Sequence, residues 1–281
     1  MLKRLLLIFF LGTISFLTRA QLLESFVHTG EIGFGVGVAH YFGDLNPDGR
    51  IKRLKPAAGI FFRKQVSNYI GIKISGEYAF LGYSDIYSEN PVQRRRNLSF
   101  NTNVWELCVS GDFNFFRFQP GFEGYNFTPY VGLGLGVFSY DPYAYLNGQK
   151  YYLRPLGTEG QGSSLYPNKK PYSPIALAIP ITLGIKYALN TKMNVFAELI
   201  YRFTNTDYLD DVSGTYAPDA FPPLPDGSPS PGFLLQDRSY ETGSSIGIKG
   251  RQRGNSLKTD SYATFKVGLS FNLQTYRCPT N

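Results

Sequence analysis

The stretch Ile175–Ala188 constrains the fold more than any other, because its residues alternate between two kinds. Odd positions carry Ile, Leu or Tyr, and even positions carry Ala, Pro, Thr, Gly or Lys. Only an extended strand turns successive side chains to opposite faces. The pattern exceeds the roughly 5–6 residues usual in soluble strands and suffices for the ~9–11 tilted residues that cross a bilayer. We predict a membrane-spanning strand, which needs partners because an open edge in lipid leaves backbone groups unpaired.

Seven further stretches show the same alternation, which gives eight strands in all. They predict an all-β fold: a transmembrane antiparallel up-and-down β-barrel with short periplasmic turns and long extracellular loops. The connections after the second, fourth and sixth strands read as short turns, and those after the other strands are longer. The longest are loops 141–173 and 204–260. The eight strands are predicted at residues 30–43, 57–65, 70–81, 99–115, 128–140, 175–188, 193–203 and 262–274.

The first twenty residues have the pattern of a secretory signal peptide. Lys3 and Arg4 precede a short apolar run at 5–17, and Ala20 ends a small-residue cleavage site. The apolar run is too short for the ~20 residues of a helical membrane anchor. We therefore expect residues 1–20 to be removed and residues 21–281 to form a single outer-membrane domain.

Composition agrees with a barrel rather than with a nucleic-acid-binding protein. The chain has 21 Tyr, 23 Phe and 30 Gly, which suits glycine-containing strands with aromatic interface belts. Without the three basic residues of the leader, 25 basic residues remain against 21 acidic ones, a mild excess. The two cysteines, Cys108 and Cys278, are expected to be free thiols, and no disulfide framework is present.

The side of each strand opposite the apolar one carries five acidic and five basic residues. In a membrane barrel this side faces the interior, where unpaired charges would be prohibitive but a matched set can form ion pairs. Eight strands leave room only for side chains, so the sequence favours a filled lumen over a diffusion pore. The predicted lumen charge network is Glu31, Arg63, Lys73, Glu77, Glu106, Asp112, Lys186, Glu198, Arg202 and Lys266.

No catalytic, cofactor or metal site is predicted. His40 shares the apolar parity of the first strand, and we interpret it as an interface residue rather than the histidine of a lipid hydrolase. The spacing of Asp207, Asp210 and Asp211 does not match a calcium-binding EF-hand loop. Glycines 132, 134 and 136 lie within a strand and are interpreted as small inward residues rather than a phosphate loop.

The run of three arginines at 94–96 has two readings. On an external loop the guanidinium groups suit the phosphates of lipopolysaccharide, so outer-membrane lipids and lipopolysaccharide are expected partners. The alternative is an ordinary solvated charged loop.

Three segments together resemble a known family. They are residues 31–46, residues 201–216 with the run Tyr-Leu-Asp-Asp-Val-Ser-Gly-Thr-Tyr, and residues 250–256. They are similar to the PorG-type, DUF6089-like outer-membrane barrels of the type IX secretion system of Bacteroidetes. The residues that carry the signature loop are Asp207, Tyr208, Asp210, Asp211, Gly214 and Tyr216.

The resemblance implies a non-enzymatic component of protein secretion, and in gliding bacteria of motility, that ties a periplasmic ring to the outer membrane. The implied partners are the ring's lipoprotein and its associated protein. Both termini would be periplasmic, and the tail at 275–281 would be available to the ring. Alternatives are a small barrel of the OmpX or OmpW kind, acting in adhesion, envelope stability or small-solute transport, and an outer-membrane lipid hydrolase.

Overall fold

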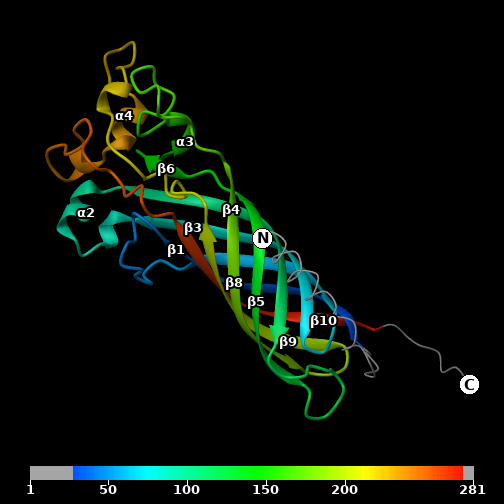
Figure 1. Ribbon diagram of the computed structural model, residues 1–281. Helices are drawn as coiled ribbons and strands as arrows, with labels where there is room; N and C mark the ends of the chain where they lie inside the picture. Colours follow the sequence, from blue (N-terminus) through cyan, green and yellow to red (C-terminus); the bar gives the residue numbers. More distant parts are fainter. Residues whose placement is uncertain (1–27, 275–281) are drawn as a thin grey trace, which may run out of the picture.

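The computed structural model describes residues 28–274, and eight long strands in this range close into an antiparallel barrel (Figure 1). Neighbours along the chain pair with each other, and the first and last strands pair to close the ring. The eight barrel strands are β1 (His28–Phe42), β2 (Lys55–Gln65), β3 (Ile70–Ser84), β4 (Ser99–Asn114), β5 (Phe127–Ser139), β8 (Ile175–Ala188), β9 (Met193–Thr204) and β10 (Ser261–Gln274).

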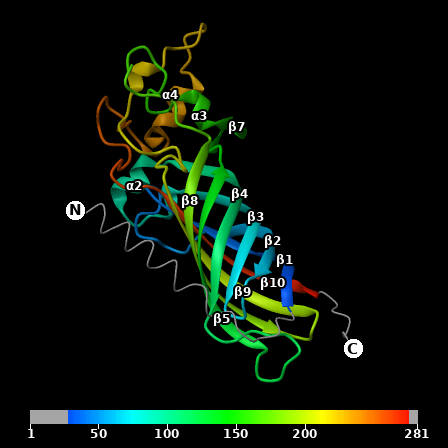
Figure 2. The same ribbon diagram turned by 45° about the vertical axis from the view of Figure 1, so that its right-hand side comes forward.

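The connections at one end of the barrel carry further elements, which form a cap over that end (Figure 1, Figure 2). β1 begins and β10 ends at the opposite end. We call the cap residues 43–54, 85–98, 140–174 and 205–260. Its elements are η2 (Asp85–Tyr87), α2 (Pro91–Arg96), the hairpin β6 (Tyr143–Leu146) and β7 (Gln149–Tyr152), α3 (Leu153–Leu156), η3 (Pro218–Ala220), α4 (Pro231–Gln236) and η4 (Ser239–Thr242).

The predicted fold class is confirmed, with every predicted strand found within a few residues of its expected bounds. The alternation of side chains is the reason, because strand residues of one parity share one face. The described residues do not include the predicted leader (residues 1–20), the predicted tail (residues 275–281) or Cys278. No helix in the range 28–274 is long and apolar enough to cross a membrane.

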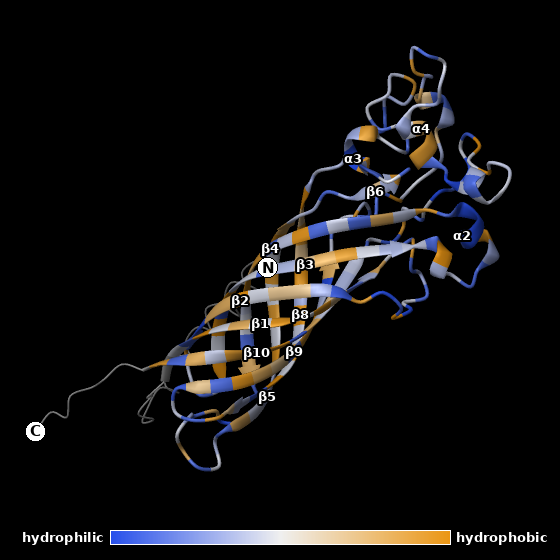
Figure 3. Cartoon of the chain, turned by 180° about the vertical axis from the view of Figure 1, so that it is seen from behind, coloured by the Kyte–Doolittle hydropathy of each residue, from blue (hydrophilic) through white to orange (hydrophobic). Residues whose placement is uncertain are grey.

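The barrel is inverted relative to a soluble one, with its apolar side outward. Leu135 is 72% exposed, whereas Arg202 is 1% exposed. Figure 3 shows apolar residues interspersed with polar ones along the barrel strands. A soluble protein rarely exposes a contiguous apolar patch larger than a few hundred Å², so this band has the architecture of a transmembrane barrel.

The hydrophobic core lies at the capped end of the barrel rather than along its whole axis. Tyr41, Phe100 and Phe138 from the barrel wall pack there with Leu209 and Leu235 from the cap, all of them buried. The buried charges occupy the rest of the interior. The fold therefore divides into an ionic lumen and an apolar plug beneath the cap.

The predicted sorting of connections by length is only partly right. Turns 66–69 and 189–192 are short, but the β4–β5 connection and the β1–β2 loop each have twelve residues. The cap also contains regular structure that the periodicity did not reveal. Local signals existed: Asn90 and Pro91 begin α2, and the Asn147-Gly148 pair, both with positive φ, turns the β6–β7 hairpin.

Candidate functional site

All ten residues of the predicted lumen network are buried inside the barrel. Arg63 binds Glu31 and, at 2.7 Å, Asp112. A second cluster joins Lys73 and Lys266 to Glu198 at 3.1 and 3.3 Å, and Lys266 also to Glu77. Arg202 pairs with Glu106.

Lys186 is the exception in this network. It forms no ion pair within the described chain, and its ammonium lies 4.4 Å from the centre of the Phe118 ring. The lumen thus contains nine charges in direct ion pairs and one cation held beside an aromatic ring.

Glycines on the inner face make the space that these long side chains occupy. A Cβ at Gly136 would lie 2.5 Å from Oε1 of Glu106, and one at Gly59 would collide with the Glu77 carboxylate. A methyl group in either place would press on a buried carboxylate that is paired with a cation. The glycine runs in the strands therefore serve the ionic lumen.

The signature loop lies in the cap, where its aspartates hold the chain together. Asp210 accepts a hydrogen bond from the Tyr41 hydroxyl at 2.5 Å and from the Val212 amide at 2.9 Å. Asp211 has φ 68°, in the left-handed region that Asp tolerates. Its carboxylate accepts from the hydroxyls of Thr158, at 2.5 Å, and Tyr172, at 2.7 Å.

Glu159, which sequence reasoning missed, is the centre of the cap. Its carboxylate accepts from the amides of Ser213 and Gly214 at 2.9–3.0 Å and pairs with Arg253 at 3.2 Å. Arg253 also donates to the Gln236 carbonyl at 3.0 Å. Glu159 stands in a polar loop without any periodic pattern, so only its tertiary partners reveal its importance.

The other signature residues complete this cluster. Tyr208 stacks on Tyr172 with ring centres 4.5 Å apart. Tyr216 is 1% exposed, and its hydroxyl has no hydrogen-bond partner in the described chain. Asp207 is half-buried with both carboxylate oxygens unpartnered, and burial raises its pKa to about 7.

The three segments that carry the family resemblance meet at one place. Residues 214–216 pair with residues 250–254 through backbone hydrogen bonds of 2.7–3.1 Å. Asp44 accepts from the Asn255 amide at 2.7 Å, and Tyr41 binds Asp210. The signature therefore encodes the packing of the cap, at the end of the barrel opposite the two ends of the described chain.

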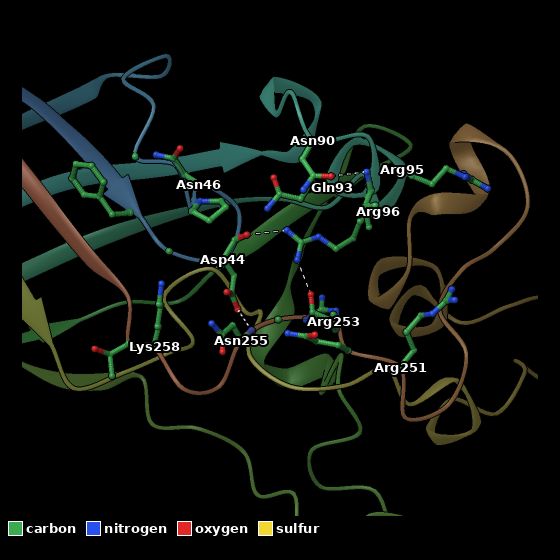
Figure 4. Close-up of a pocket in the computed structure, with 18 of the residues that line it drawn as sticks. Asp44, Asn46, Asn90, Gln93, Arg95, Arg96, Arg251, Arg253, Asn255 and Lys258 are labelled. Atoms are coloured by element: carbon green, nitrogen blue, oxygen red, sulfur yellow. Dashed lines mark hydrogen bonds between the residues drawn. The ribbon is translucent and has the colours of Figure 1, made fainter.

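An open cavity of about 1100 Å³ lies between the β1–β2 loop, α2 and residues 246–261 (Figure 4). Its charged lining consists of Arg95, Arg96, Arg251, Arg253, Lys258 and the single acid Asp44. Burial raises the pKa of Asp44, although Arg96 and the Asn255 amide oppose that shift. The lining also includes Phe42, Tyr201, Tyr216 and Ser261.

Of the two readings of the arginine run at 94–96, lipopolysaccharide binding stays a prediction, and a solvated charged loop does not describe Arg95 and Arg96. Arg96 binds Asp85 through two nitrogens at 2.7 and 2.8 Å and donates to the carbonyls of Asp44 and Arg253. Arg95 donates to the carbonyls of Ser239 and Ser244. Only Arg94 is an ordinary exposed charge, because the other two join α2 to the long loop.

His40 is not the lipid-facing interface residue that its parity predicts. It is 5% exposed because the β1–β2 loop covers it, and its Nε2 lies 3.0 Å from the Asn46 amide nitrogen. In the described chain no serine or carboxylate hydrogen-bonds the ring. No group of His, Cys, Asp and Glu in residues 28–274 is arranged to hold a metal ion. Cys108 is free and buried.

A family model described as a domain of unknown function, DUF6089, matches residues 3–158, which is more than half of the 281 residues. The chain belongs to the DUF6089 family. The match to the DUF6089 model includes β1–β7. It ends at Thr158, one residue before Glu159, and so does not include the signature loop. No curated protein sequence matches the chain.

Several solved barrel structures resemble this DUF6089 member at low identity. Neisserial surface protein A has 10% identity and a TM-score of 0.42, with 87% of this chain and 97% of that chain covered. Ail of Yersinia pestis has 10% identity and a TM-score of 0.39, with 88% and 100% covered. OprG from Pseudomonas aeruginosa has 10% identity and a TM-score of 0.38, with 89% and 98% covered. At these scores the likenesses carry no argument about function.

Proposed function

We propose that the protein is an integral outer-membrane barrel with a structural, non-enzymatic role, both of its termini in the periplasm. The observation that carries the proposal is the inverted barrel, with a band of apolar side chains outside and paired ions inside. The apolar plug under the cap argues against a diffusion pore, since Leu81, Phe100 and Leu209 are fully or almost fully buried there.

Membrane fractionation and electrophoresis test this proposal. A folded outer-membrane barrel resists detergent until it is boiled, so the unboiled protein is expected in the outer-membrane fraction with a migration different from the boiled sample. Protease added to intact cells should cut the cap while the barrel strands survive. A water-soluble periplasmic product whose migration does not change on boiling would overturn the proposal.

Within this role we propose that the barrel is a component of the type IX secretion machinery, tying its periplasmic ring to the outer membrane. Family membership and the resemblance of three segments support this assignment. The signature residues pack inside the cap, so we propose that the ring contacts the opposite end of the barrel. The candidate segments there are turns 66–69, 115–126 and 189–192, and the tail at 275–281. Exposed Phe122 and Tyr125 make turn 115–126 the strongest candidate surface.

Deletion of the gene tests the secretion role. Loss of type IX cargo from the medium is the expected result, and deletion of residues 275–281 should leave insertion intact but weaken co-purification of the ring proteins. Paired substitution of Phe122 and Tyr125 by Ser should weaken it too, with Ser substitution of exposed Leu165 and Leu257 in the cap as the matched control. Normal cargo export in the deletion strain would reject the secretion role.

A second candidate is an autonomous barrel of the OmpX or OmpW kind that acts at the cell surface. The cap with its cationic cavity favours this candidate, because a role confined to the periplasm would not explain a cavity on the cap. Normal export combined with altered adhesion or permeability in the deletion strain would support this candidate. The lipid-hydrolase alternative has no supporting geometry around His40.

A further inference from the structure

The cap cavity carries positive charge that the described chain does not neutralise. Arg96 is paired with Asp85, and Arg253 with Glu159 and Asp211. The remaining three cations, Arg95, Arg251 and Lys258, form no ion pair with the described residues, and Asp44 is the one acid in the lining. Like charges gathered on a concave surface raise the local potential. The cavity is therefore built to attract an anion.

A second and independent feature of the cavity is the Tyr216 hydroxyl. Tyr216 lines the cavity, and its buried hydroxyl has no hydrogen-bond partner within the described residues. Buried hydroxyls are rarely left without a partner, because the missing bond costs free energy. A ligand oxygen entering the cavity would supply the partner.

The position of the cavity sets the kind of anion. Its barrel-side wall is formed by Phe42 and Tyr201, whose rings lie 5.7 Å apart, and by Ser261. These residues stand at the capped ends of β1, β9 and β10, next to lipid-side residues such as Phe203 and Phe265. Aromatic residues in such positions mark the membrane–water interface. The cavity thus opens where the headgroups of the outer leaflet would lie.

The volume gives room for a ligand much larger than a small inorganic ion. At about 1100 Å³ the cavity is larger than the ~300–1,000 Å³ typical of sites for small organic ligands. Sugar rings suit its mixture of aromatic faces and side-chain amides, which include Asn90, Gln93 and Gln252. Guanidinium and ammonium groups suit phosphate.

We propose that this cavity binds a phosphorylated saccharide, supplied as the headgroup of an outer-leaflet glycolipid. Arg251 and Lys258 contact the phosphate, and the Tyr216 hydroxyl bonds a saccharide oxygen. Arg95, whose guanidinium donates to Ser239 and Ser244, adds positive charge to the lining. The lipid source rests on the proposed membrane location, whereas recognition of the phosphorylated saccharide does not.

Binding to the full-length protein in detergent tests the proposal. The probes are a phosphorylated glucosamine disaccharide in its acylated form and the same disaccharide without acyl chains. The test variant is Arg251→Gln with Lys258→Gln. The matched control is Arg94→Gln with Lys170→Gln, which removes one Arg and one Lys from exposed cap positions outside the cavity lining.

The test variant should bind the acylated probe about ten-fold more weakly, since it loses two charge-assisted contacts, and the control should stay within about two-fold of the wild type. Tyr216→Phe should weaken binding about three-fold without lowering the melting temperature, because it removes a hydroxyl that has no internal partner. The boiling-dependent gel shift verifies that each variant is folded.

The outcomes separate the two sources of the ligand. Tighter binding of the acylated probe supports a glycolipid. Equal affinity for both probes supports the phosphorylated saccharide and rejects the lipid source, even if the protein proved not to reside in the membrane. Absence of binding to both probes, or an equal loss in the test and control variants, overturns the proposal.

Discussion

The hydroxyl of Tyr41 lies 2.5 Å from Oδ2 of Asp210 and 3.1 Å from Oδ1 of Asp260. One group on the barrel wall thereby ties together the two ends of the loop at 205–260. A tyrosine hydroxyl has a single proton to donate, which goes to Asp210 at the shorter distance. Burial raises the pKa of both carboxyls well above the usual range, and the pKa of Asp260 is raised further by Asp210. A protonated Asp260 can therefore donate back to the Tyr41 oxygen.

Replacing Tyr41 by Phe should loosen the cap and leave the barrel in place. The change removes the hydroxyl that donates from the barrel wall to Asp210. It leaves buried acceptors unsatisfied, which costs about 1–3 kcal/mol. Limited proteolysis should cut the loop at 205–260 faster, while the boiling-dependent gel shift persists. Tyr145→Phe, at a half-exposed position of the β6–β7 hairpin, is the control and should change neither. Equal cutting of both variants would contradict this role of Tyr41.

The cap should lose stability as the pH rises through 6 to 7. Burial raises the pKa of Asp207 to about 7 and that of Asp211 to about 6, above the ordinary 3.8 of the unfolded chain. The folded cap thus binds protons more tightly than the unfolded chain, so this contribution is complete below pH ~4 and is lost on passing the raised pKa values. Cap proteolysis as a function of pH measures it.

Asp207→Asn should remove part of that dependence. The amide carries no charge to bury, so the cap of the variant should be more stable than the wild type at pH 8 by about 1–2 kcal/mol, the shift being discounted for the partial exposure of Asp207. Asp226→Asn is the control in the same loop, because the bonds from Ser228 lower the pKa of this exposed carboxyl. A wild-type cap with no pH dependence between 5 and 8 would count against the burial of Asp207.

Two cations in the lumen should respond oppositely to replacement by Met. Arg202→Met leaves Glu106 buried without its cation and should destabilise the barrel by about 3–5 kcal/mol. Adding Glu106→Gln should recover much of that loss, because the orphaned charge is gone. Lys186→Met removes a buried ammonium that has no ion pair in residues 28–274 and should be neutral or stabilising. Denaturant unfolding in detergent gives the comparison, and equal losses for both single variants would show that direct ion pairing does not set the cost.

Two strand glycines should likewise differ when replaced by Ala. At Gly136 the new Cβ would meet Glu106 Oε1 at 2.5 Å, whereas at Gly111 it has nothing within 4 Å. Overpacking at Gly136 should cost about 1–3 kcal/mol. Gly111→Ala on the outer face should be neutral or slightly stabilising, and the same unfolding measurement distinguishes the two. A neutral Gly136→Ala would mean that Glu106 can move at no cost.

The sequence foretold the barrel well because period-two alternation is local. The alternation within each strand predicts which side chains face the lumen and which face outward, as Arg202 and Leu135 illustrate. The structure of the cap could not be predicted from such a local pattern. His40 has the parity of a lipid-facing residue but is buried, because the β1–β2 loop, which lacks the alternation of the strands, folds over it.

The signature residues show the same limit. Asp210 and Asp211 look like exposed loop acids in the sequence, yet both are buried by partners 39 to 169 positions away. The cavity is assembled in the same way, from Arg95, Arg251 and Lys258 on two separate loops.

By itself the sequence determined the number of barrel strands, the direction of their side chains and the presence of matched charges in the interior. Those properties follow from neighbouring residues along the backbone, where steric geometry dictates which face a side chain occupies. Only the tertiary structure decided which ions pair, that Lys186 has no ionic partner, and that a cationic cavity opens beside the apolar belt. Such contacts join residues far apart in the chain, and closing those distances depends on the packing of the whole molecule rather than on any local pattern.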